Sequence, residues 1–364
     1  MQSGPPERAV VLTHGLFLSP QAKTTHAMIR GPSRYELLCV VDPVHAGQDA
    51  RQLLASGAAR EGGPGGAGRV PIVASLQAAL ELPGGPPSHC VVGVATGGGV
   101  LPEGLRETLL EAAGAGLTLV NGLHQRLSDD ADLCRLVRAA GGSILDIRAP
   151  RPISALRFYT GEALELEIPR IAVLGTDCAL GKRTTATWIV RELRRRGRTA
   201  ELIYTGQSGW MQGHRFGFIL DATPNDFVSG ELENAILQCA RESAPEFMLL
   251  EGQSSLRNPT GPCGAELIVS AGAAGVILQH APGRRFFKGL KDYPIPPLAG
   301  ECELIGRYGT RVLAVAINLE GLERGAGLAL AARLETELGL PVVAPLEQGV
   351  DRLVDAVLAR EAVP

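Results

Sequence analysis

The chain of 364 residues is too long for one small domain, and at about 150 residues per domain it predicts two. Its 35 basic and 38 acidic residues give a formal charge of −3, which argues against a nucleic-acid binder with a strongly basic face. Apolar residues make up 45% of the chain but aromatic residues only 4%, so the predicted core consists of Ala, Val, Leu and Ile, the mixture that fills parallel sheets flanked by helices.

The first half of the chain alternates short apolar strands with helical patterns, which is typical of a parallel sheet. Strands are predicted at 9–13, 35–42, 70–73, 90–95, 117–121 and 143–147. Helices are predicted up to about Arg30 and at 76–80, 102–113 and 129–139. The glycine-rich segment 57–68 is predicted to be a mobile surface loop.

Two prolines in the RAPRP segment at 148–152 cannot continue a helix and mark the end of the first predicted domain, 1–150. A linker is predicted over 151–168, followed by a second domain over 169–364. In that domain, strands are predicted at 171–174, 199–205, 247–250, 275–279, 312–317 and 341–344. Helices are predicted at 182–196, 228–242, 325–338 and 350–360. The expected fold class is therefore α/β, with two domains that are each a mainly parallel sheet flanked by helices.

The strongest chemical signal is the segment GTDCALGKRTT, which lies directly between a predicted strand and a predicted helix. Such a turn points backbone N–H groups at an anion, adds the positive end of the helix dipole and supplies the Lys182 ammonium for the outer phosphates. The turn is one residue longer than usual, as it is in dethiobiotin synthetase and related P-loop enzymes, which it resembles. We therefore predict a phosphate-binding loop of P-loop type formed by Gly175, Thr176, Asp177, Cys178, Ala179, Leu180, Gly181, Lys182, Arg183, Thr184 and Thr185.

One position of this loop departs from the usual pattern. Arg183 stands where a Mg²⁺-binding Ser or Thr normally follows the lysine. Thr184 or Thr185 could take over the metal role, or the ligand needs no tightly held metal.

Polar residues follow other predicted strands, at the edge of the sheet where α/β proteins bind ligands. Glu251 ends the strand 247–250 like a Walker-B acid, so it could bind Mg²⁺ or act as a general base. Glu251 could instead only cap a turn. Asp226 and His280 are further candidate catalytic residues, although His280 could instead be a surface charge. The predicted substrate-binding residues are Gln207, Ser208, Gln253, Arg284 and Arg285, and Asn318 is predicted to contact the base of the bound cofactor.

Several classes of function and location are disfavoured. The N-terminal half lacks a glycine-rich dinucleotide fingerprint after its first strand, which argues against NAD binding. The seven cysteines include no CxxC pair, no secretory signal is visible, and no apolar run reaches the ~18 residues of a membrane helix. We therefore expect reduced thiols in a soluble cytoplasmic protein that binds neither nucleic acid nor a membrane.

The segments HGLF, AKTTHAMIRGPSRYELLCVVD, GTDCALGKRTT, EGQSSL and HAPGR, in this order, closely resemble the domain-of-unknown-function 1611 family, which is also named the D-glutamate N-acetyltransferase family. The resemblance extends over nearly the whole chain. It implies a Rossmann-like domain joined to a P-loop domain, a homo-oligomer, and transfer of an acetyl group from acetyl-CoA to D-glutamate. The chain departs from similar sequences at EGQSSLRNPTGPCG, where they read EGQGSLSHPAYSG. A His and a Tyr are lost there, which bears on the substrate.

Three functions are compatible with these residues. In the leading hypothesis, Lys182 and the loop amides bind the phosphates of acetyl-CoA, and Glu251 deprotonates the amino group of an acidic amino acid. Arg284 or Arg285 would hold the carboxylate of that substrate. The main alternative is an ATP-dependent ligase or kinase in which Thr184 and Glu251 hold Mg²⁺. The third is a nucleotide-binding regulatory module without turnover.

Overall fold

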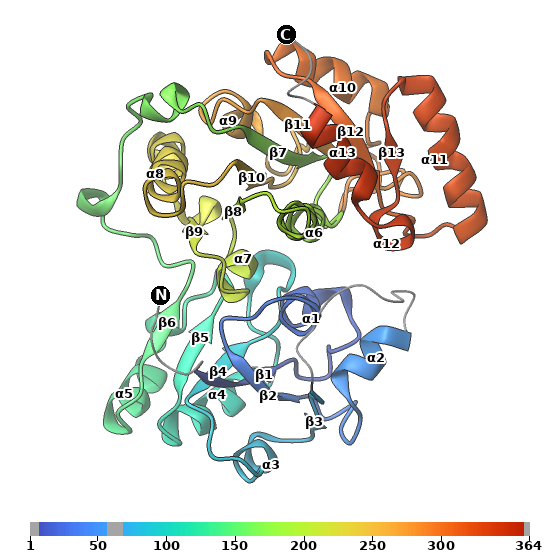
Figure 1. Ribbon diagram of the computed structural model, residues 1–364. Helices are drawn as coiled ribbons and strands as arrows, with labels where there is room; N and C mark the ends of the chain where they lie inside the picture. The colour runs from blue at the N-terminus through green and yellow to red at the C-terminus, as the bar shows by residue number, and fades with distance from the viewer. Residues whose placement is uncertain (1–6, 57–67, 360–364) are drawn as a thin grey trace. The chain divides into compact units, whose positions relative to one another are not determined.

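The computed structural model describes residues 7–56 and 68–359, which form two compact units (Figure 1). Unit 1 comprises residues 1–150 and 207–214, and unit 2 comprises residues 151–206 and 215–364. The chain therefore passes from one unit to the other at three places, after Pro150, Gly206 and His214. The predicted mobile loop 57–68 lies outside the described residues apart from Gly68.

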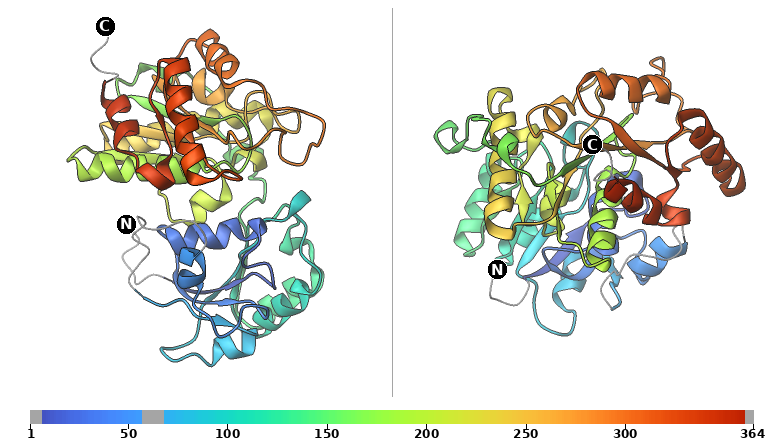
Figure 2. Two further views of the ribbon diagram at one scale, coloured as in Figure 1. Left: turned by 90° about the vertical axis from the view of Figure 1, so that its right-hand side faces the viewer. Right: turned by 45° about the horizontal axis from the view of Figure 1, so that its top comes forward.

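Unit 1 is built on a six-stranded parallel sheet with the strand order β3-β2-β1-β4-β5-β6, the order of a Rossmann fold. Its strands are β1 (Arg8–Leu12), β2 (Glu36–Val41), β3 (Ile72–Val73), β4 (His89–Val92), β5 (Thr118–Asn121) and β6 (Ile144–Asp146). Its helices are α1 (Lys23–Arg30), α2 (Ala50–Ser56), α3 (Leu76–Leu80), α4 (Leu105–Gly114), α5 (Ala131–Ala139) and α7 (Gln207–Met211). Helices α1 and α2 cover one face of the sheet, and α4 and α5 cover the other (Figure 2).

Unit 2 is built on a seven-stranded parallel sheet with the order β13-β12-β11-β7-β10-β8-β9. Its strands are β7 (Arg170–Gly175), β8 (Ala200–Tyr204), β9 (Phe216–Gly217), β10 (Phe247–Glu251), β11 (Gly275–His280), β12 (Val312–Ile317) and β13 (Val342–Val343). Its helices are α6 (Lys182–Arg195), α8 (Asn225–Ser243), α9 (Ala265–Ile268), α10 (Leu298–Arg307), α11 (Arg324–Leu338), α12 (Pro345–Gln348) and α13 (Asp351–Ala359).

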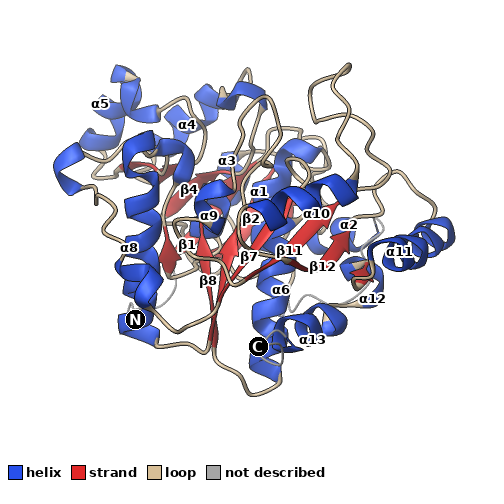
Figure 3. Ribbon diagram, turned by 90° about the horizontal axis from the view of Figure 1, so that it is seen from above, coloured by secondary structure: helices blue, strands red, loops and turns tan. Residues whose placement is uncertain are grey.

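The hydrophobic core of unit 2 lies on both faces of this sheet. Apolar residues of α6 and α13 pack on one face, and those of α8, α9 and α10 pack on the other (Figure 3). The central strand β7 lies between β10 and β11, so the strand order changes direction at β7. In open α/β sheets, ligands bind at the carboxyl ends of the strands at such a point.

The predicted α/β fold with two parallel-sheet domains is confirmed. Every predicted strand is present. The central strands β7, β10 and β12 are apolar runs that are buried throughout, as expected for strands covered on both faces of a parallel sheet. Helices α2, α7, α9, α10 and α12 and the two-residue strand β9 were not predicted. In the described part of the chain, no helix is both long enough and apolar enough to cross a membrane.

Candidate functional site

The predicted phosphate-binding loop joins the carboxyl end of β7 to the first turn of α6. Strand β7 is buried throughout, and Ile189 and Leu193 fix α6 against the sheet. Between them, Ala179 and Gly181 have positive φ angles of 53° and 104°. Gly181 is the N-cap of α6, where a residue with a Cβ would be strained. Left-handed residues at the start of a helix form a concave turn lined by backbone N–H groups, which favours anions.

Lys182 is the first residue of α6, and its side chain is buried beside the loop. Its Nζ donates to the carbonyl oxygens of Asp177 at 2.7 Å and Ser254 at 2.8 Å. An ammonium group has three N–H donors, so these two carbonyls leave one for an incoming oxygen. Burial lowers the pKa of the lysine to about 8, which means that the charged ammonium is destabilised in the free site, at a cost in free energy. A bound phosphate would relieve that cost.

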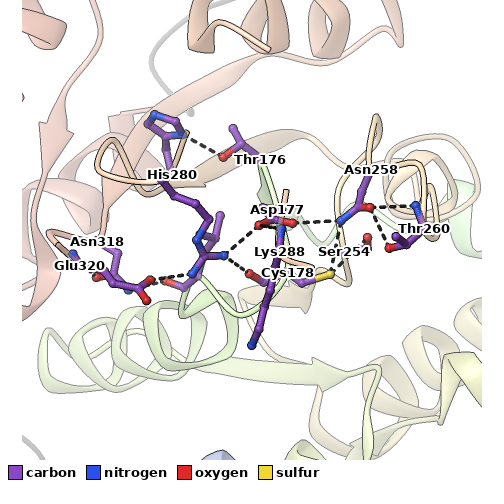
Figure 4. Close-up of polar contacts among 12 residues, drawn as sticks. Thr176, Asp177, Cys178, Ser254, Asn258, Thr260, His280, Lys288, Asn318 and Glu320 are labelled. Atoms are coloured by element: carbon purple, nitrogen blue, oxygen red, sulfur yellow. Dashed lines mark hydrogen bonds and ion pairs between the residues drawn. The ribbon is translucent and has the colours of Figure 1, made fainter. Parts of the chain in front are cut away.

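Asp177 organises the loop from inside the protein (Figure 4). Its carboxylate is fully buried; Oδ1 accepts a hydrogen bond of 3.0 Å from the Asn258 amide, and Oδ2 accepts one of 2.9 Å from the Lys288 backbone N–H. Oδ2 also lies 2.9 Å from Arg284 Nη1, which donates to the Cys178 carbonyl as well. Asp177 therefore fixes two other loops of unit 2 to the phosphate-binding loop.

Arg183 and Glu251 form an ion pair next to the loop. Arg183 Nη1 lies 3.5 Å from Glu251 Oε1, and the two side chains are 20% and 5% exposed. Glu251 Oε2 accepts a hydrogen bond from the Thr205 backbone N–H at 3.2 Å. Burial raises the pKa of Glu251, while Arg183, Thr205 and Lys182 oppose that rise. The Thr205 hydroxyl in turn accepts from the Gln253 amide, so Gln253 supports the loop that follows β8.

The two threonines of the loop have different surroundings. Thr184 is exposed. The Thr185 hydroxyl is buried and donates to Gln279 Oε1 at 2.7 Å. Among the described residues, neither hydroxyl forms a hydrogen bond with Glu251. The binding of Mg²⁺ by Thr184 and Glu251, expected only if a Mg²⁺–nucleotide is the ligand, stays a prediction.

Two further predicted residues contact the loop from neighbouring strands. His280 Nδ1 shares a hydrogen bond of 2.8 Å with the Thr176 hydroxyl, and burial lowers the pKa of His280 to about 4. The imidazole is therefore neutral near pH 7. Asn318 donates from Nδ2 to the Leu180 carbonyl at 3.1 Å and accepts from the Glu320 backbone N–H at Oδ1. Both ends of the Asn318 amide are used to hold loops.

Other predicted site residues are not joined to the phosphate-binding loop. Asp226 is exposed in the first turn of α8, and Arg285 is exposed with its guanidinium 5.2 Å from the Phe286 ring centroid. Gln207 and Ser208 lie in α7, within unit 1, where Arg148 donates to Gln207 and Thr24 shares a hydrogen bond with Ser208. Their predicted catalytic or substrate-binding roles stay predictions. Arg284 does reach the loop, but Asp177, Cys178 and Glu320 hold its guanidinium.

Sequence reasoning missed several residues that build the site, among them Ser254, Asn258 and Lys288. Ser254 contributes a backbone carbonyl and has a positive φ of 38°, and Lys288 contributes a backbone N–H, so neither side chain gave a signal. Asn258 lies in the segment that departs from similar sequences, and its position there was the one available signal.

Comparison with known proteins assigns both units to one family. Residues 157–354 match "Domain of unknown function (DUF1611_C) P-loop domain", and residues 46–150 match "Domain of unknown function (DUF1611_N) Rossmann-like domain". The chain belongs to the DUF1611 family. The resemblance predicted from the sequence is therefore confirmed, as are the Rossmann-like and P-loop character of its two domains.

Two curated relatives and one solved structure cover most of this DUF1611 chain. A D-glutamate N-acetyltransferase of Tritonibacter scottomollicae is 30% identical over 276 residues, which span 74% of this chain and 80% of the relative. A D-glutamate N-acetyltransferase of a Pseudoalteromonas species is 28% identical over 272 residues, 72% of this chain and 79% of the relative. The crystal structure of a DUF1611 family protein from Anabaena variabilis is 30% identical with a TM-score of 0.84, and the match covers 97% of this chain and 99% of that one.

Proposed function

We propose that this protein is an N-acetyltransferase that moves the acetyl group of acetyl-CoA to the amino group of an acidic amino acid such as D-glutamate. The observation that carries the proposal is the match, at about 30% identity over about three quarters of the chain, to two proteins named for that activity. Because the matched family domains account for both units, the likeness is not limited to one shared module.

The phosphate-binding loop supplies a place for the diphosphate of acetyl-CoA. Lys182 has one N–H donor beyond those that contact Asp177 and Ser254, and the left-handed turn at Ala179 and Gly181 favours an anion. The donors present therefore fit a phosphate group. Acetyl-CoA supplies the thioester, whereas the residues of this loop bind and orient its phosphates.

The length of CoA limits which residues can act on the amino group. Its pantetheine arm separates the diphosphate from the thioester by roughly 15 Å of extended chain. Glu251 contacts Arg183 beside the loop, so it lies at the phosphate end of an extended acetyl-CoA. We propose that Glu251 positions Arg183 there, and that the base which takes the proton from the amine lies farther along the carboxyl edge of the sheet. Asp226, exposed in the first turn of α8, is a candidate for that base.

The experiment is a thiol-release assay with purified full-length protein, acetyl-CoA and a panel of D- and L-amino acids. We expect free CoA thiol with D-glutamate and less with other acidic amino acids. A panel without release above the rate of acetyl-CoA alone would refute the proposal. Mg²⁺-dependent release of ADP from ATP would instead favour the ligase or kinase. That alternative is supported by the position of Glu251 as the last residue of β10, where a Walker-B acid lies.

The Glu251→Gln variant separates positioning from proton transfer. If Glu251 positions Arg183, the variant raises KM for acetyl-CoA and keeps the pH profile of kcat. If Glu251 is the base, kcat falls by about 10²–10⁴-fold with KM for acetyl-CoA unchanged. Asp226→Asn is the matched test of the other candidate base.

A further inference from the structure

The position that holds a divalent metal in other P-loop proteins is filled differently in this chain. A P-loop ordinarily offers Mg²⁺ the hydroxyl of the residue after the lysine, and an acid at the end of a nearby strand completes the site. Here the residue after the lysine is Arg183, whose Nη1 lies 3.5 Å from Glu251 Oε1 at the end of β10. A guanidinium, not a hydroxyl, therefore faces the acid.

The nearby oxygen atoms of Glu251 and Thr185 already take part in hydrogen bonds within the protein. Glu251 Oε2 accepts from the Thr205 N–H, and the Thr185 hydroxyl is used by Gln279. A metal cation at Glu251 would also face the positively charged guanidinium of Arg183.

We propose that Arg183 takes the place of the divalent metal, so that this P-loop binds a diphosphate ester without Mg²⁺. Arg183 carries a delocalised charge on a planar fork that matches two phosphate oxygens, and Lys182 adds a second cation from the adjacent position. Glu251 is the positioning residue that holds the fork in place from the opposite side. That the ester is CoA rests on the proposed function, whereas independence from metal rests on Arg183 and Glu251 alone.

The experiment measures equilibrium binding of CoA and, separately, of ADP to the full-length protein by calorimetry, once with EDTA and once with MgCl₂. For the wild type we expect dissociation constants that agree within about twofold in the two buffers. Arg183→Thr restores the usual hydroxyl. We expect this variant to bind about tenfold or more weakly in EDTA and to regain affinity with MgCl₂.

Two variants serve as controls. Arg183→Lys keeps the charge but removes the fork, so it should bind more weakly than the wild type and stay insensitive to Mg²⁺. Arg191→Thr makes the matched substitution on the same helix, away from the loop, and should leave binding unchanged. Thermal unfolding of each variant shows that it is folded before binding is compared.

The outcomes separate this inference from the proposed function. A wild type that binds either probe about tenfold more tightly with MgCl₂ would overturn the inference. If ADP binds equally in both buffers but CoA binds in neither, the inference stands and the acetyl-CoA proposal fails. Failure of both probes to bind in either buffer would overturn both.

Discussion

Asp177 shows how one residue of a motif can shape a site through contacts within the protein. Its position in the loop predicts proximity to phosphate, but a buried carboxylate there would repel an anion unless it were neutralised. Arg284 supplies the opposite charge at 2.9 Å. The other partners of Asp177, Asn258 and Lys288, could not be predicted from the sequence, because they lie 81 and 111 residues farther along the chain. The local sequence pattern predicts that a phosphate-binding loop is present, whereas the long-range contacts that shape this loop depend on the fold.

At the same scale, Lys182 predicts how ligand binding depends on pH. Burial lowers the pKa of its ammonium group to about 8, so the free site loses its charge above that pH. A phosphate ligand favours the charged form, which means that the lysine must take up a proton on binding. We expect the dissociation constant of acetyl-CoA to rise by up to about tenfold per pH unit above pH 8. Calorimetric titrations between pH 7 and about 9.5 measure this slope.

The matched control is Lys182→Arg, because a guanidinium keeps its charge throughout that range. Its affinity for acetyl-CoA should be lower than that of the wild type at pH 7 but independent of pH above 8. Parallel pH profiles for the two proteins would show that Lys182 is not the group that titrates.

At the scale of elements, most strands of the two sheets and the clearly amphipathic helices were predictable, whereas helices such as α7 and α10 were not. Strand β12 and helix α3 have the predicted bounds, since each is an uninterrupted or strictly periodic apolar pattern. Helix α7 was not predicted, because the segment 204–209, which contains its first residues Gln207 and Ser208, has the small and amide residues of a binding loop. It is helical because Met211 is buried in the core of unit 1, a tertiary contact that local propensity does not contain.

The predicted linker 151–168 is bound to helix α8 by two buried acids. Glu231 accepts a hydrogen bond from the Arg157 backbone N–H at 2.7 Å, and Glu233 accepts one from the Thr160 backbone N–H at 2.7 Å. Gly230 permits this close approach, because a Cβ there would lie 2.1 Å from the Arg157 carbonyl oxygen. The two acids therefore anchor the chain that enters unit 2.

Glu233→Ala should therefore destabilise unit 2. The substitution leaves the N–H groups of Thr160 and Ala163 without their acceptor, at an expected cost of about 2–4 kcal/mol. Burial alone would raise the pKa of Glu233, but the N–H groups of Thr160 and Ala163 hold it below its ordinary value. The stabilisation is thus present above a pH of about 4.3 and is lost as the pH falls below it, so the wild type and the variant should converge in acid.

Urea unfolding at pH 7 and at about pH 3.5 measures both effects. Glu242→Ala on the exposed side of the same helix is the matched control and should leave the midpoint nearly unchanged. Equal midpoints for Glu233→Ala and the wild type at pH 7 would show that the acid does not anchor the segment.

At the scale of the whole molecule, each unit is made of two stretches of the chain that are separated in the sequence. Residues 207–214 lie between two stretches of unit 2 but belong to unit 1. Within unit 1, Met211 is fully buried, the Gln212 amide donates to the Ala27 carbonyl, and the Arg34 guanidinium lies 4.0 Å from the centroid of the Trp210 ring. No composition shift marks this exchange, which is why a single boundary was predicted. Unit 1 is therefore complete only when the later part of the chain is present.

This exchange can be tested with the two tryptophans of the chain, since Trp188 lies in α6 of unit 2 and Trp210 in α7 of unit 1. Met211→Ala removes a buried side chain from the core of unit 1, at an expected cost of about 2–5 kcal/mol. In a Trp188→Phe background, Met211→Ala should lower the urea midpoint reported by Trp210 fluorescence. In a Trp210→Phe background, it should leave the Trp188 transition in place, because Met211 contributes nothing to the core of unit 2. Equal shifts in both backgrounds would mean that the two units unfold as one cooperative block, and no shift in either would show that α7 is not part of the core of unit 1.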